Sequence, residues 1–156
     1  MIIEKEELTS LIQHRNKMLL ITRVKEYDLK EGSLYAEFQV SGDDLFFDPA
    51  LNAVPSWVGF EYIAQAISAL SGLRFRERGE EPKIGFILSV SALQIEIPAF
   101  KAGSVVEVKI KETNVIDEVY SFLGEVFLGG KKAAEGKLTV MDANDEQVKA
   151  LKEGKA

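Results

Sequence analysis

The sequence contains no cysteine and only one histidine, His14. Without cysteine the chain can form no disulfide, no thiolate nucleophile and no cysteine–metal site. A zinc site built almost wholly from carboxylates would match poorly the nitrogen and sulfur ligands that zinc prefers. We therefore expect no metal and no cofactor. Any chemistry within one chain that needs an imidazole must use His14.

Positive charge is also scarce, since 19 Lys and Arg face 25 Asp and Glu, giving a net charge of −6. Nucleic acids and anionic membranes both favour basic surfaces, so neither is an expected partner. The length of 156 residues fits a single domain, 1–156. Its acidic start is followed by no long apolar run and is not a signal peptide, which predicts a cytoplasmic protein.

One long stretch, from Pro49 to Leu73, carries a single charged residue, Glu61. Its length could span a bilayer, but Pro55 and the central Glu61 favour a helix buried in a soluble core. The predicted helix covers 56–73. Its apolar residues point in nearly every direction, so we expect other structure to wrap it.

The polar residues of this helix gather on one narrow stripe: Glu61, Gln65 and Ser68, continued by Gly72. Other elements are predicted around the helix. They are an N-terminal helix within 1–13, an extended segment over 18–24, a strand over 34–40, four strands within 84–97, 106–111, 120–128 and 138–140, and a polar tail over 143–156. One buried helix with an antiparallel sheet curled around it is an α+β fold of the hotdog type.

Glu61 is the sharpest candidate for chemistry. An ionised carboxylate is expensive to bury, and a carboxyl group that holds its proton near neutral pH can act as a general acid. The alternative is a structural role, in which Glu61 pairs with an arginine or faces a dimer interface. His14, followed by Arg15, is either a catalytic base or a surface and capping residue.

Further candidates lie at the start, in the middle and at the end of the long helix. Backbone N–H groups of Ser56 and Trp57 could stabilise an oxyanion, although every helix start offers such groups. Gln65 is a candidate substrate-binding residue. Arg74, Arg76 and Arg78 form either a solvated face or a docking site for an acidic carrier protein.

These residues resemble a known family, the 3-hydroxyacyl-[acyl carrier protein] dehydratases. LIQHRNKMLLITRV, from Leu11, is similar to that family's LPHRxPFLLVDRV segment, and VPSWVGFEYIAQ, from Val54, to its MPGxxxxEAMAQ helix. IPAFKAG, from Ile97, resembles RPVxPGDxL. The resemblance spans Leu11 to Met141, and the order and spacing of the three motifs make it specific.

PSWVGFEYIAQ is more similar still to the AWVGIEYMAQ form of divergent dehydratase-like proteins of aryl-polyene-type clusters. The resemblance implies a hotdog fold and a 3-hydroxyacyl thioester substrate on acyl carrier protein or CoA. It also implies a role in polyketide or fatty-acid-like chain building. Family sites lie between two subunits, which implies a homodimer, or a heterodimer with a conventional dehydratase subunit.

The family's catalytic histidine lies in a GHFPGHP loop, and the equivalent residues 45–53 contain no histidine. The resemblance therefore implies the acid, Glu61, but not the base. Three arrangements remain open: His14 removes the C2 proton, a partner subunit supplies the histidine, or the chain is a non-catalytic acyl-binding partner. A hotdog thioesterase, which needs a helix carboxylate but no histidine, is the competing enzyme class.

Overall fold

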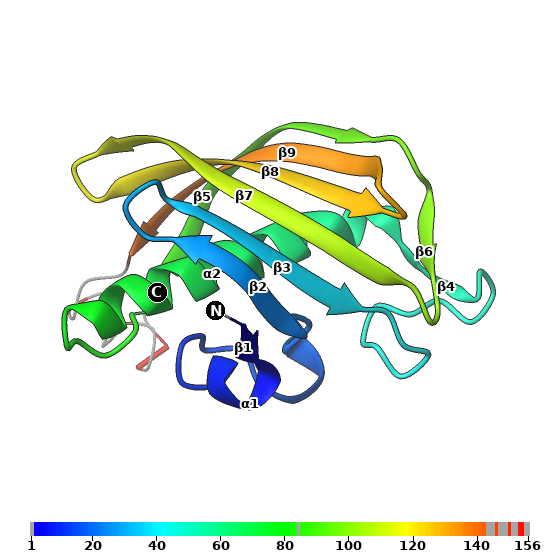
Figure 1. Ribbon diagram of the computed structural model, residues 1–156, viewed down its shortest axis with the longest axis horizontal. Coiled ribbons are helices and arrows are strands. Elements are labelled where there is room, and N and C mark those ends of the chain that lie inside the picture. Colours follow the sequence, from blue (N-terminus) through cyan, green and yellow to red (C-terminus); the bar gives the residue numbers. More distant parts are fainter. Residues whose placement is uncertain (1, 84, 143–145, 147–149, 151–152, 155–156) are drawn as a thin grey trace.

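The computed structural model describes residues 2–83, 85–142, 146, 150 and 153–154. Its main parts are a seven-stranded antiparallel sheet and the long helix α2 (Gly59–Glu77), over which the sheet arches (Figure 1). This arrangement confirms the predicted α+β class. None of the described helices is long and apolar enough to cross a bilayer.

The large sheet has the strand order β1-β2-β3-β7-β8-β9-β5. A small second sheet pairs β4 with β6. The strands are β1 (Ile3–Glu4), β2 (Arg23–Asp28), β3 (Ser33–Gln39), β4 (Ala53–Pro55), β5 (Gly85–Ile95), β6 (Ala99–Lys101), β7 (Val105–Ile116), β8 (Val119–Leu128) and β9 (Lys131–Asp142). β5 and β1 are the two edges, and β5 has a described partner on one side only.

The long helix begins later and ends later than predicted. A 3₁₀ turn, η2 (Ser56–Val58), precedes α2, which continues through the arginine-rich segment to Glu77. Just beyond the helix end, Gly79 has a φ of 73°, the left-handed conformation that glycine adopts without strain. The Glu80 N–H then donates to the Phe75 carbonyl and closes the helix end.

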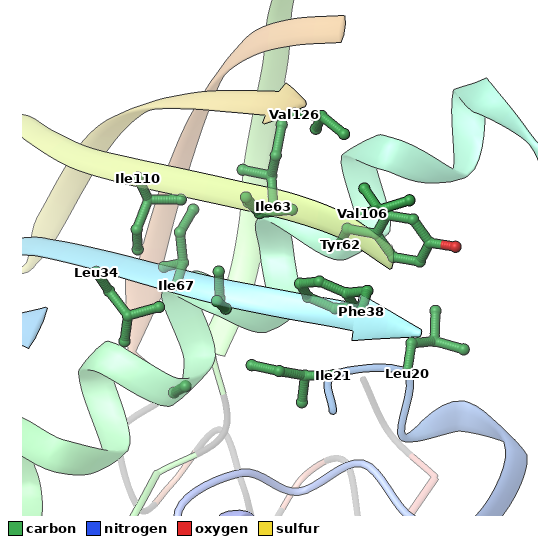
Figure 2. Close-up of a cluster of buried hydrophobic side chains, with 14 of the residues drawn as sticks. Leu20, Ile21, Leu34, Phe38, Tyr62, Ile63, Ile67, Val106, Ile110 and Val126 are labelled. Carbon is green, nitrogen blue, oxygen red and sulfur yellow. The ribbon is translucent and has the colours of Figure 1, made fainter. Parts of the chain in front are cut away.

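The core lies between α2 and the strands above it. Side chains from both layers interdigitate, as Figure 2 shows for Leu34 and Phe38 of β3, Val106 and Ile110 of β7, Val126 of β8, and Tyr62, Ile63 and Ile67 of α2. The rings of Phe38 and Tyr62 stack with their centroids 4.5 Å apart. This packing fixes the rotation of α2 and so decides which of its residues face away from the sheet.

The N-terminal segment differs from the predicted helix. It contains the short strand β1, one turn of helix in α1 (Lys5–Leu8) and a 3₁₀ turn, η1 (Asn16–Met18). Antiparallel pairing of β1 with β2 holds Ile3 and Glu4 in an extended conformation, so the helix begins only at Lys5. The segment packs tightly on α2, since a Cβ on Gly72 would overlap the backbone of Leu11. Most of the predicted tail, 143–156, lies outside the described residues.

Candidate active site

The structure brings His14 and Glu61 together. Nε2 of His14 lies 3.4 Å from Oε1 of Glu61, and their side chains are 27% and 17% exposed. His14 sits between α1 and η1, whereas Glu61 projects from the first turn of α2. Nδ1 of His14 is buried and has no hydrogen-bond partner among the described residues. Among the described residues, the polar contact recorded for the ring is the one with Glu61.

Gln65 lies one helical turn beyond Glu61 and is fully buried. Its Oε1 accepts hydrogen bonds from the N–H groups of Leu20 (2.9 Å) and Ile21 (3.2 Å). Its Nε2 donates to the Met18 carbonyl (2.6 Å) and to Oε1 of Glu61 (3.3 Å). These four bonds use the whole capacity of the amide. In this structure the bonds of the Gln65 amide all go to protein atoms, and substrate binding by Gln65 stays a prediction.

Arg15 supports the segment that carries His14. Its guanidinium donates to three backbone carbonyls, those of Ile12 (2.6 Å), His14 (2.8 Å) and Thr9 (2.6 Å). The sequence analysis gave Arg15 no role of its own. The only signal was its place beside His14 in the matching motif, because bonds to backbone carbonyls leave no side-chain pattern in a sequence.

A cavity of about 510 Å³ lies between α2, the segment around His14 and strands β5, β8 and β9, and both His14 and Glu61 line it. Its lining combines apolar side chains with polar and charged ones. Among the polar lining residues, the Ser71 hydroxyl donates to Asp142, and partial burial raises the pKa of the Asp142 carboxyl. The other lining residues that matter here are Arg15, Ala64, Ile67, Ser68, Arg74, Arg78, Phe86, Tyr120, Phe122 and Val140.

The predicted oxyanion groups at the helix start do not border this cavity. The Ser56 N–H donates to the Pro98 carbonyl at 3.0 Å, so it is not free for a ligand. Trp57 is half exposed, and its ring packs against Phe46 and Phe60. Neither residue lines the space beside His14 and Glu61. This corrects the expectation of free N–H groups at Ser56.

The three arginines at the end of α2 do not form an unpaired cationic patch. Arg74 is mostly buried and pairs with Glu112 at 2.6 Å, while Arg76 pairs with Glu7 and Arg78 with Glu80. Arg74 also donates to the Leu29 carbonyl, which makes it a structural residue. Only Arg76 and Arg78 are exposed enough to reach a docking partner.

Comparisons with known proteins place the chain among the hotdog dehydratases. The ApeP-like family, described as ApeP dehydratase, matches residues 6–152, and the chain belongs to this family. The resemblance drawn from the three motifs and the predicted hotdog fold are both confirmed.

Individual relatives agree with this assignment. The ApeI:P dehydratase heterocomplex from Xenorhabdus doucetiae contains a chain that is 26% identical, with a TM-score of 0.82 and coverage of 92% of this chain and 95% of that one. A 3-hydroxyacyl-[acyl-carrier-protein] dehydratase FabZ from Chlamydia trachomatis serovar L2 is 25% identical over 146 residues, covering 92% and 94%. The PaaI protein of Escherichia coli, at 12% identity and a TM-score of 0.58 over 76% of this chain and 80% of that one, shares the fold.

Proposed function

We propose that this protein removes water from a 3-hydroxyacyl thioester, carried on acyl carrier protein or CoA, to give a trans-2-enoyl thioester. The observation that carries the proposal is the contact between His14 and Glu61 on the wall of the cavity. It joins a base and an acid within one chain, although the family's usual histidine loop is absent. Membership of the ApeP-like family supports the same reaction, and we place it in the cytoplasm, in aryl-polyene-like chain building.

The reaction needs two proton transfers, and the pair supplies both. Neutral His14 takes the C2 proton of the substrate, and protonated Glu61 donates its proton to the 3-hydroxyl as the C3–O bond breaks. The electrons of the C2–H bond form the C2=C3 double bond, and the hydroxyl leaves as water. The product state is an imidazolium beside a carboxylate, whose opposite charges stabilise each other.

The starting state is restored through water. The imidazolium of His14 releases one proton and the carboxylate of Glu61 takes one up, so the cycle is balanced. Both side chains are partly exposed, which permits this exchange. The apolar side chains that line the cavity, among them Ile67, Phe122 and Val140, suit the hydrocarbon part of the acyl chain.

A second subunit is part of the proposal. Strand β5 is an edge strand whose large apolar side chains are exposed: Ile87, Leu88, Val90, Leu93 and Ile95. A long apolar edge of this kind favours pairing with another chain. We propose that a second copy or a companion dehydratase subunit pairs there, consistent with the heterocomplex of the Xenorhabdus doucetiae relative. Arg76 and Arg78 would meet an acidic carrier protein.

The test is turnover by the purified chain. A 3-hydroxyacyl thioester on a carrier protein or pantetheine is supplied, and enoyl formation is followed by absorbance and mass. We expect turnover by the wild type, and its loss in both His14→Ala and Glu61→Gln. Hydrolysis of a saturated acyl thioester would instead support a thioesterase. Turnover that appears only after a companion subunit is added, and persists in His14→Ala, would assign the base to that subunit.

A further inference from the structure

The cavity beside His14 and Glu61 follows one face of α2. The helix residues that form this wall recur at intervals of three or four positions and so lie on the same side of the helix: Glu61, Ala64, Ser68, Ser71, Phe75 and Arg78. At the rise per residue of an α-helix, the stretch from Glu61 to Ser71 is about 15 Å long. The helical wall therefore has a direction, and Glu61 is its first residue.

Strands β8 and β9 pair with each other and contribute to the same cavity, and two contacts place them along α2. Gly124 of β8 lies beside Ile63, because a Cβ on Gly124 would overlap the Ile63 side chain. Asp142, the last residue of β9, lies beside Ser71, whose hydroxyl donates to its carboxyl group at 3.4 Å. In the β8–β9 ladder, the cavity-lining residues between these two points are Tyr120, Phe122 and Val140. The strand side of this stretch is therefore mainly apolar.

From Ser71 onward the lining of the cavity changes to charged groups. Arg78 and Lys83 both line it, and both cations lie over the buried ring of Phe75, at 4.7 and 5.7 Å from the ring centroid. The half-buried carboxyl group of Asp142 belongs to the same end of the cavity. A hydrocarbon chain that reached these groups would remove water from them and return no hydrogen bond, which is unfavourable.

We propose that Ser71, Arg78, Lys83 and Asp142 form a polar stop, which limits the length of the hydrocarbon chain that the cavity accepts. The inference rests on the proposed function, since that reaction puts C3 of the substrate beside Glu61. An extended chain that follows α2 from there to Ser71 has about twelve carbons. The substrates are therefore 3-hydroxyacyl thioesters with up to about fifteen carbons in the acyl chain. Carbons beyond that length meet the polar stop and add no affinity.

The test measures affinity as the acyl chain is lengthened. The probes are saturated acyl pantetheine analogues in which an amide replaces the thioester, so that they can be neither dehydrated nor hydrolysed by the protein. Calorimetric titration of the wild type should show Kd falling about two- to fourfold per added carbon while the chain covers the apolar stretch. The fall should stop at about twelve carbons beyond C3, where the chain reaches the polar stop. A Kd that keeps falling at the same rate beyond that length would overturn the proposal.

Two pairs of variants assign the limit to the polar stop. Asp142→Leu and Lys83→Leu each replace a polar group with a hydrocarbon, so the break should move to longer chains and the longest probes should bind about tenfold more tightly. Asp142→Asn keeps a polar group at the same place and should keep the break at the wild-type length. A break that stays in place in both leucine variants would overturn the proposal. If Asp142→Leu does not fold, as judged by its melting curve, the exposed Lys83→Leu gives the same comparison.

The binding series is independent of turnover. A wild type that shows the break but turns over no 3-hydroxyacyl thioester would overturn the proposed function and leave the polar stop standing. A wild type that turns over these thioesters but shows no break would overturn the polar stop alone.

Discussion

The imidazole of His14 lies 3.4 Å from the carboxylate of Glu61, although one residue belongs to the N-terminal segment and the other to the central helix. In the proposed dehydration, this contact lets one chain supply both the acid and the base. A single functional unit of this kind predicts how variants combine, because removing either member disables the same step.

His14→Ala and Glu61→Gln should each lower kcat by about 10²- to 10⁴-fold. The double variant should be no less active than the weaker single variant, since the two residues act in one step. Steady-state kinetics of the four proteins decides this, with Lys17→Gln, an exposed residue that does not line the cavity, as the control. Losses that multiply in the double variant would mean that the two residues act independently.

Arg15 predicts a second effect on activity, exerted through the backbone. Its guanidinium holds the carbonyls of Thr9, Ile12 and His14 at 2.6–2.8 Å. Arg15→Gln should loosen this segment, lower kcat by about tenfold and reduce the free energy of unfolding by about 1–2 kcal/mol. Lys17→Gln, a nearby exposed lysine, should change neither in the same kinetic and urea-unfolding assays. Equal kcat and equal free energy of unfolding in the two variants would show that Arg15 does not support the site.

The polar stripe on the long helix shows what sequence spacing can and cannot tell. The predicted stripe comprised Glu61, Gln65 and Ser68, continued by Gly72, and Ser68 lines the cavity together with Glu61. In the structure this face contacts the N-terminal segment: Glu61 meets His14, Gln65 meets residues 18–21, and Gly72 meets Leu11. The identity of that covering segment could not be predicted, because it depends on tertiary packing between parts of the chain that are distant in sequence.

More of the fold than of the site could be predicted from the sequence. Alternation in residues such as Leu34, Ala36 and Phe38 predicted β3, since one face of a sheet is buried. The short strands β1, β4 and β6 were not predicted, because two or three residues carry too little periodicity. Ser56 resembled a free helix start, but its N–H donates to Pro98, whose carbonyl comes from a distant loop.

Gly72 predicts a test of the packing between the N-terminal segment and α2. A Cβ at this position would lie 2.8 Å from the carbonyl carbon of Leu11 and closer still to its oxygen, and backbone atoms cannot move aside cheaply. Gly72→Ala should destabilise the protein by about 2–4 kcal/mol. Gly59→Ala in the same helix, where the nearest atom is 3.5 Å away, should be neutral or stabilising by about 0.5 kcal/mol. Thermal unfolding of the pair checks this, and equal melting temperatures would contradict it.

The arginines at the end of α2 should separate into two classes. Arg74→Ala leaves the mostly buried carboxylate of Glu112 without its partner and should cost about 2–3 kcal/mol of stability. Arg76→Ala removes an exposed pair with Glu7 and should cost less than about 0.5 kcal/mol.

For binding of acyl carrier protein, the exposed arginines should matter more than Arg74. Arg76→Glu with Arg78→Glu should weaken acyl carrier protein binding, most strongly at low salt. Urea unfolding tests the predicted differences in stability, and calorimetric titration tests the affinity for acyl carrier protein. Unchanged affinity in the double variant would exclude docking at this site.

Asp142 predicts how stability depends on pH. Burial is the main cause that raises the pKa of this carboxyl above its ordinary value of 3.8, while the Ser71 hydroxyl and the charges of Lys83 and Arg78 oppose the shift. The folded protein therefore holds the Asp142 proton more tightly than the unfolded chain does. This contribution to stability is fully present below pH 3.8 and is lost as the pH rises through the folded-state pKa.

Asp142→Asn removes the ionisation and retains an oxygen that can accept from Ser71. At pH 7 the variant should be more stable than the wild type, by less than about 1 kcal/mol because the carboxyl is only half-buried. The difference should shrink as the pH falls and disappear near pH 3, where Asp142 is protonated in both states. Urea unfolding of the two proteins between pH 3 and pH 7 measures this. A difference that stays constant over that range would show that the substitution acts through packing rather than through the proton.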